Sequence, residues 1–169
     1  MIETLNRMAQ EGVIDTYAIG GAVGATFFLE PIATQDIDVF VAFRPEPGRT
    51  LVSLEPVYRY LIAQGATTEG EYLIIDDWPV QFLPATDALA EDALAQAMPI
   101  EVEGAPTKVF RAEHLAALAL QTGRAKDKAR VLAFLEAEVM DFEMFEAIVE
   151  RFGLREKWDR FKLQFEVEG

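Results

Sequence analysis

Residues 17–43 read YAIGGAVGATFFLEPIATQDIDVFVAF, and this stretch decides the fold that the sequence predicts. The apolar residues at 17–19 predict a short strand, which leads through two glycines into a helix-like run at 22–28. A turn follows, and the β-branched and aromatic residues at 36–41 predict a second strand. The stretch therefore predicts a strand, a tight turn, a helix and a return strand.

Two pairs of residues in this stretch carry chemistry. Asp36 and Asp38 stand at i and i+2, so on a strand both carboxylates lie on one face and can converge on one cation. Gly20 and Gly21 precede the predicted helix, where close backbone approach, free N–H groups and the helix dipole favour an anion such as a phosphate. An anion site beside a carboxylate pair suits a metal-bound nucleotide.

Composition limits the classes of protein that remain. The 169 residues are enough for one domain with a helical appendage, and an apolar fraction of 51% with 12 Phe indicates a packed core. The absence of cysteine excludes disulfides, thiol catalysis and cysteine-ligated zinc. A formal charge of −14 repels nucleic acid from most of the surface, so an extended nucleic acid is not an expected partner.

The chain shows no targeting signal at its start and no long apolar run. Its first eight residues, MIETLNRM, lack a basic region followed by an apolar one. No apolar run approaches the length that a bilayer requires. We therefore expect a cytoplasmic protein without a membrane partner.

The remaining patterns predict an α+β fold, with a small mixed sheet covered by helices and a C-terminal helical extension. Further helices are predicted at 2–9, 54–62, 87–98, 111–121 and in segments from 124 to 165; strands at 71–75, 79–83, 100–102 and 107–109; and a loop at 44–50. We expect a core at 1–110 and a helical region at 111–169 that packs on it.

Gly20-Gly21, a spacer helix and the segment Thr34-Gln35-Asp36-Ile37-Asp38-Val39 together resemble the signature of the DNA polymerase β-type nucleotidyltransferase superfamily. The small bacterial members of the minimal and AbiEii-like kind are the most similar. The resemblance implies that Asp36 and Asp38 hold Mg²⁺ or Mn²⁺. It implies that Gly20, Gly21 and Thr34 contact a nucleoside triphosphate, whose nucleotidyl group passes to an acceptor that the sequence does not identify.

The resemblance also implies a third carboxylate on a later strand, and here the chain departs from the pattern. The best match is Val80-Gln81-Phe82-Leu83-Pro84, which places Gln81 at the third catalytic position. A glutamine offers a neutral carbonyl where hard divalent cations depend on carboxylate charge. Asp76 and Asp77 are candidate substitutes, although two acids before Trp-Pro are also typical turn formers.

A second stretch, residues 111–130, resembles the helix-Gly-Arg-x-Lys-Asp-helix segment that follows the catalytic core in AbiEii-like proteins. Gly123 is predicted to end one helix, and the next begins with cations that include Arg124 and Lys126. Cations at a helix start are unfavourable to its dipole. Either a bound triphosphate or salt bridges to acids could compensate, and the sequence leaves both open. The single histidine, His114, is predicted to be a surface or packing residue.

Three functions remain open from the sequence. The Gly-Gly pair with Asp36 and Asp38 favours a metal-dependent nucleotidyltransferase. Gln81, and the lack of a lysine that the family often carries in the helix before Gly123, favour a catalytically degenerate module that binds nucleotide or a protein partner, as an antitoxin-like subunit does. A purely structural α/β domain is the third.

Overall fold

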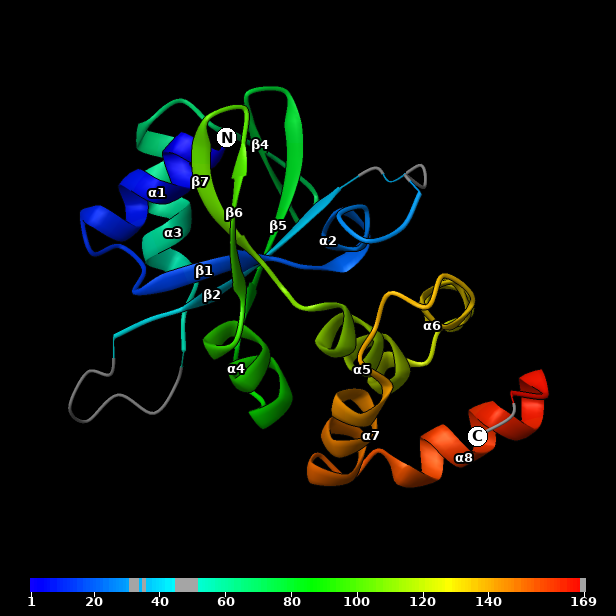
Figure 1. Cartoon of the computed structure of the whole chain (residues 1–169). Helices are drawn as coiled ribbons and strands as arrows, with labels where there is room; N and C mark the ends of the chain where they lie inside the picture. The colour runs from blue at the N-terminus through cyan, green and yellow to red at the C-terminus, as the bar shows by residue number, and fades with distance from the viewer. Residues whose placement is uncertain (31–33, 35, 45–51, 168–169) are drawn as a thin grey trace.

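The computed structural model describes residues 1–30, 34, 36–44 and 52–167 (Figure 1). Gln35 and most of the loop predicted at 44–50 lie outside these residues. The helices are α1 (Ile2–Gln10), α2 (Gly21–Ala25), α3 (Glu55–Ala63), α4 (Ala88–Ala95), α5 (Ala112–Thr122), α6 (Ala125–Glu136), α7 (Phe142–Arg151) and α8 (Arg155–Phe165). The strands are β1 (Thr16–Ile19), β2 (Ile37–Ala42), β3 (Thr67–Glu69), β4 (Tyr72–Ile75), β5 (Trp78–Pro84), β6 (Met98–Val102) and β7 (Ala105–Val109).

Within the described residues, the strands form one mixed sheet in the order β3-β4-β5-β2-β1-β7-β6. The central strand β2 runs antiparallel to β1 and parallel to β5. Helices pack on this sheet, and α5 to α8 follow it in the chain (Figure 1). The predicted α+β class is therefore confirmed.

Side-chain alternation along β2 divides the core between the two faces of the sheet. Ile37, Val39 and Val41 are buried in a cluster that includes residues of α1 and α3. The intervening Phe40 packs instead against a second cluster, which is formed largely by α4, α5 and the helices after them. Asp38 has the parity of Phe40, so its carboxylate lies on the face that the helical region borders.

Helix α5 anchors the C-terminal helices to the sheet. It contacts α2 and α4 on one side and α6, α7 and α8 on the other. His114 on α5 is fully buried, and its Nε2 lies 2.9 Å from Asp92 of α4. It is therefore a packing residue, one of the two roles predicted for it. The division of the chain near residue 110 into two parts stays a prediction.

Several predicted boundaries were wrong. The helix predicted at 22–28 ends at Ala25, and the helix predicted at 87–98 ends at Ala95, after which Met98 begins β6. Asp36 precedes β2 rather than lying within it, and β3 was not predicted because its three residues are all exposed. None of the described helices is long and apolar enough to cross a membrane.

Candidate active site

Strands β2 and β5 bring two of the predicted site residues side by side. In the parallel pairing of these strands Asp38 stands opposite Gln81. Val80 and Phe82 flank Gln81 and are buried on the other face. Gln81 therefore shares the face of Asp38, as period-two geometry predicted.

The turn after β1 places the glycine pair against Asp38. The Gly20 N–H donates to the Asp38 main-chain carbonyl at 2.9 Å. Gly21 has a φ of +56°, and a Cβ at this position would lie 1.6 Å from Asp38 Oδ2. Only a glycine leaves room for the carboxylate here. A serine at this position would collide with Asp38 in this arrangement.

We predict that Gly21→Ala lowers stability and also displaces the Asp38 carboxylate. The positive φ alone costs about 1–2 kcal/mol for an alanine. Gly12→Ala is the matched control, because Gly12 has a φ of +75° with nothing within 4 Å of the added Cβ. Thermal unfolding should show a loss in both variants, with the larger loss in Gly21→Ala. Equal losses would contradict the close approach to Asp38.

These residues line a cleft of about 480 Å³ between the sheet and α6, which we call the β2–α6 cleft. Its lining residues are Ala22, Thr34, Asp36, Asp38, Tyr72, Gln81, Arg124, Lys126, Ala129 and Arg130. Two sequence segments more than 80 residues apart, each predicted to contact a nucleotide, thus meet in one cavity. Gly20 and Gly21 do not line the cleft, although Gly21 abuts the carboxylate of Asp38.

The electrostatics of the cleft centre on Asp38. Burial raises the pKa of the Asp38 carboxyl, and the charge of Asp36 raises it further. Arg130, Lys126 and Arg124 oppose this rise, but the pKa stays above its ordinary value. The negative charge of Asp38 is therefore incompletely compensated, which favours an additional cation beside it.

Thr34 and Asp36 approach each other at the mouth of the cleft. The Thr34 hydroxyl donates to the Asp36 main-chain carbonyl at 3.1 Å and lies 3.3 Å from Asp36 Oδ1. The contact with Oδ1 orients the Asp36 carboxylate. Thr34 is thus placed to hold a site carboxylate, whereas its predicted contact with nucleotide stays untested.

The cations of α6 divide between two sides of the helix. Asp127 is buried and pairs with Arg124 at 2.7 Å and with Arg130 at 3.6 Å. Lys126 lines the β2–α6 cleft and forms no ion pair with any described residue. Lys128 points elsewhere, toward Gln164 of α8. Salt bridges therefore compensate part of the positive charge of α6. The charge of Lys126 is not compensated by any described acid, so it is accessible to a ligand in the cleft.

Arg130 and Tyr72 line the cleft but were not predicted to be site residues. Arg130 follows Lys126 by four residues, and residues at this spacing lie on the same face of a helix. The sequence spacing therefore could have identified Arg130 as a neighbour of Lys126. Tyr72 joins the site only because β4 pairs with β5, which a local pattern does not reveal. Partial burial raises the pKa of the Tyr72 hydroxyl, and the nearby charge of Asp36 adds to the effect.

The donors in the cleft fit a metal ion that is shared with a ligand. No group of three His, Cys, Asp or Glu side chains suited to a metal occurs among the described residues. Mg²⁺ is commonly bound by one or two carboxylates together with substrate phosphates, and Asp36 and Asp38 supply two. Asp76 and Asp77 do not line the cleft; both have positive φ in the β4–β5 turn, so they form the turn.

Comparison with solved structures identifies proteins of similar fold. The antibiotic-resistance factor ANT(2″)-Ia in complex with adenylyl-2″-tobramycin superposes with a TM-score of 0.54 at 18% identity, over 91% of this chain and 95% of that one. A solution structure of ANT(2″)-Ia gives 0.52 at 16% identity, over 98% and 95%. An antigenic nucleotidyltransferase-like protein from Paracoccidioides brasiliensis gives 0.53 at 11% identity, over 80% and 74%.

No protein-family model matches the sequence. No curated protein matches it either. The likeness therefore rests on structure, and it spans nearly the whole of ANT(2″)-Ia. It includes both the mixed sheet and the helices after it, and the AbiEii-like subgroup is not distinguished. The chain has a nucleotidyltransferase-like fold.

Proposed function

We propose that the protein binds a divalent metal ion together with a nucleoside triphosphate in the β2–α6 cleft. The observation that carries the proposal is the meeting of Asp36 and Asp38 with Arg124, Lys126 and Arg130 in one cavity. A metal–triphosphate complex carries both charges that such a site accommodates, a cation for the carboxylates and an anion for the basic side chains. The nucleotidyltransferase-like fold supports this assignment.

Some residues of the cleft would supply charge to the metal and the phosphates, and others would position these charged side chains. Asp36 and Asp38 would hold Mg²⁺ or Mn²⁺, which when bound would neutralise phosphate charge and activate the attacking oxygen of an acceptor. Lys126 and Arg124 would neutralise the phosphate oxygens, and Asp127 holds the Arg124 guanidinium in place at 2.7 Å. Gly21 keeps the backbone clear of Asp38. Catalysis of nucleotidyl transfer consists mainly of such positioning and charge stabilisation.

The Lys126 side chain offers a direct test of the nucleotide site. Lys126→Ala should weaken triphosphate binding about tenfold, because one charge-assisted contact to phosphate is lost. The unliganded protein should keep its stability, since Lys126 is exposed. Titration of each nucleoside triphosphate with Mg²⁺ or Mn²⁺, followed by calorimetry or thermal shift, measures the effect.

Lys108→Ala is the matched control for that titration. Lys108 is an exposed lysine of β7 outside the cleft, where it donates to the Thr16 hydroxyl at 3.0 Å. Removing it changes the net charge equally but should leave affinity unchanged. Equal affinity losses in both variants would indicate a general charge effect. Absence of triphosphate binding by the native protein would overturn the proposal.

The alternative function is a nucleotide-binding module without transferase turnover, and Gln81 favours it. Gln81 occupies the register position beside Asp38 where a third carboxylate is expected. Its neutral amide ligates a metal weakly and cannot act as a base. Release of pyrophosphate during incubation with metal and triphosphate separates an active enzyme from a binding module. The acceptor, a protein partner included, stays undetermined.

A further inference from the structure

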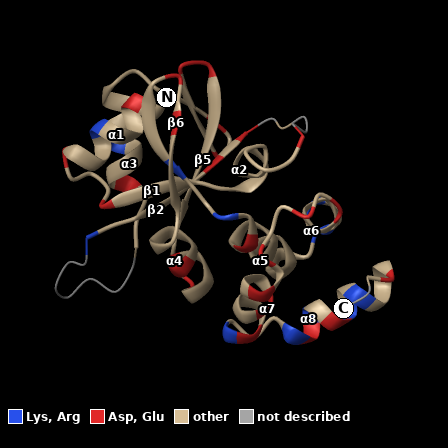
Figure 2. Ribbon diagram, viewed as in Figure 1, with Lys and Arg blue, Asp and Glu red and all other residues tan. Residues whose placement is uncertain are grey.

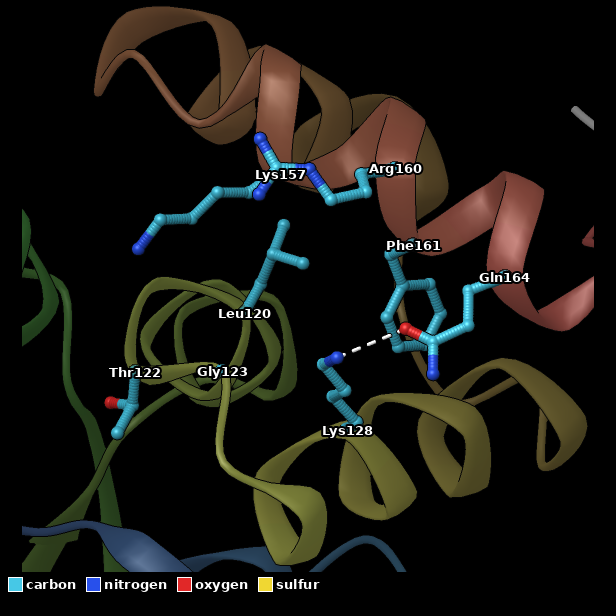
Figure 3. Close-up of a pocket in the computed structure, with 8 residues that line it drawn as sticks. All are labelled: Leu120, Thr122, Gly123, Lys128, Lys157, Arg160, Phe161 and Gln164. Carbon is cyan, nitrogen blue, oxygen red and sulfur yellow. Dashed lines mark hydrogen bonds between the residues drawn. The ribbon is translucent and has the colours of Figure 1, made fainter.

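A second cavity lies within the C-terminal helices, bordered by α5, α6 and α8 (Figure 3). Its volume is about 230 Å³. Its lining residues are Leu120, Thr122, Gly123, Lys128, Lys157, Arg160, Phe161 and Gln164. We call it the α6–α8 groove. Leu120 and Phe161 give it an apolar wall, and cationic side chains approach this wall from two helices.

The groove contains three cations and no acid among its lining residues. Lys128 donates to Gln164 Oε1 at 2.9 Å, and Lys157 donates to the main-chain carbonyl of Gln121. Both acceptors are neutral, so the two charges are not cancelled. Over the part of the chain that the structure describes, neither these lysines nor Arg160 forms an ion pair with a carboxylate.

This absence of acidic partners contrasts with the surroundings. The chain has 29 acidic and 15 basic residues, and acidic and basic positions alternate along α8 (Figure 2). Arg155 of α8 pairs with Glu146 of α7 at 3.2 Å, and Lys162 pairs with Asp159 within α8 at 3.4 Å. Acids are therefore available nearby, yet the groove gathers cations alone. Positive charges that have no acidic partner favour an anion beside them.

We propose that the α6–α8 groove binds a small phosphomonoester with an apolar or ring-shaped body. The phosphate would accept from Lys157, Arg160 and Lys128, and the ring would lie against Phe161 and Leu120. The volume is small for a ligand pocket, which suits a metabolite-sized molecule. This site is distinct from the β2–α6 cleft, because the two cavities share no lining residue.

The two cavities are nevertheless joined through one turn. Thr122 and Gly123 line the groove, and the next residue, Arg124, lines the β2–α6 cleft. Gly123 ends α5 with a φ of 71°, and Arg124 is the N-cap of α6. A ligand in the groove would thus contact the turn that positions Arg124. Binding in the groove itself does not depend on the proposed nucleotide site.

The chain provides its own reporter for the groove. Trp158 is fully buried and stacks on Phe161 with ring centroids 5.6 Å apart. The other tryptophan, Trp78, is 58% exposed on β5, and Trp78→Phe leaves Trp158 as the single tryptophan, whose fluorescence is excited selectively over that of the tyrosines. Phenyl phosphate is the probe, added with EDTA and without nucleotide so that the cleft holds no metal complex. Benzyl alcohol is the neutral counterpart.

Phenyl phosphate should change Trp158 fluorescence saturably, and benzyl alcohol should not. In the same background, Lys157→Gln with Arg160→Gln should weaken phenyl phosphate binding by at least about tenfold, because two charged contacts are lost. Lys126→Ala should leave it unchanged. Both replaced side chains are exposed, and a thermal unfolding curve checks that the double variant folds.

The proposal would be overturned by the absence of a saturable change with the native groove, by an equal response to benzyl alcohol, or by undiminished binding in the double variant. Loss of binding in Lys126→Ala would place the phosphate in the β2–α6 cleft and would also overturn it. Because neither metal nor nucleotide is present, these outcomes are independent of whether the proposed function holds.

Discussion

Replacing Asp36 and Asp38 together by asparagine is expected to abolish the stabilisation that Mg²⁺ and a nucleoside triphosphate confer. A ligand present at one hundred times its dissociation constant stabilises a protein by about 2.7 kcal/mol. For a chain of this size that corresponds to a rise in melting temperature of roughly 5–10 °C. The variant loses both carboxylates of the cleft, so this rise should disappear in a thermal-shift measurement with metal and triphosphate.

The unliganded variant should be at least as stable as the native protein. Burial and the charge of Asp36 raise the pKa of the Asp38 carboxyl, so its ionised form is unfavourable in the folded state near neutral pH. An asparagine at this position removes that cost. We therefore expect the two acids to strengthen ligand binding while they lower the stability of the unliganded protein, as is common at binding sites.

Asp76→Asn with Asp77→Asn is the matched control for the Asp36 and Asp38 variant. These two acids form the β4–β5 turn and do not line the cleft. The control removes the same amount of charge and should retain the whole ligand-dependent rise in melting temperature. A rise that persists in the Asp36 and Asp38 variant, or vanishes in the control, would contradict the assignment of the metal ligands.

The parts of the fold that the sequence predicted are those with a strong local signal. β2 is rich in β-branched and aromatic residues, and Asp87 and Asp141 cap α4 and α7 by accepting from main-chain N–H groups at 2.9 and 3.0 Å. Such patterns act within a few residues of each other. The strand β3 lacks one, because it is short and exposed and exists only through its pairing with β4.

The geometry of the candidate site could be predicted only in part, because local patterns do not show which segments pack together. Asp38 and Gln81 follow from period-two geometry once their strands are taken to be neighbours. The close approach of Gly21 to Asp38 and the entry of Tyr72 into the cleft depend on three-dimensional packing. For the cations of α6, salt bridges to Asp127 account for Arg124 and Arg130. Lys126 has no acidic partner in the described chain, and its contact with a triphosphate stays a proposal.

Gln81→Asp is the second variant with a large expected effect. The new carboxylate would stand beside Asp38 across the β2–β5 pair. Without metal, like-charge repulsion should lower stability by about 1 kcal/mol, because Asp38 is already disfavoured as an anion. With Mg²⁺ or Mn²⁺, the third carboxylate should tighten metal binding about tenfold or more. The dependence of stability on metal concentration measures both effects.

Gln81→Asn separates carboxylate charge from side-chain length. Asparagine keeps the amide of the native residue and has the length of aspartate, so it should show neither the loss of stability nor the gain in metal affinity. If both variants gain affinity, the shorter side chain is the cause and the charge argument fails. If neither changes, position 81 does not reach the metal.

Turnover should respond in the same direction as metal binding. A glutamine cannot accept the proton that an attacking hydroxyl loses, whereas an aspartate beside the metal carboxylates can. We therefore expect weak or absent pyrophosphate release from the native protein and a measurable rate from Gln81→Asp, followed with an assay for inorganic pyrophosphate. Brisk turnover by the native protein, with a lower rate in Gln81→Asp, would mean that Gln81 is not at the catalytic position. The third ligand would then have to lie elsewhere, and because Asp76 and Asp77 do not line the β2–α6 cleft, it would require movement of the β4–β5 turn toward Asp38.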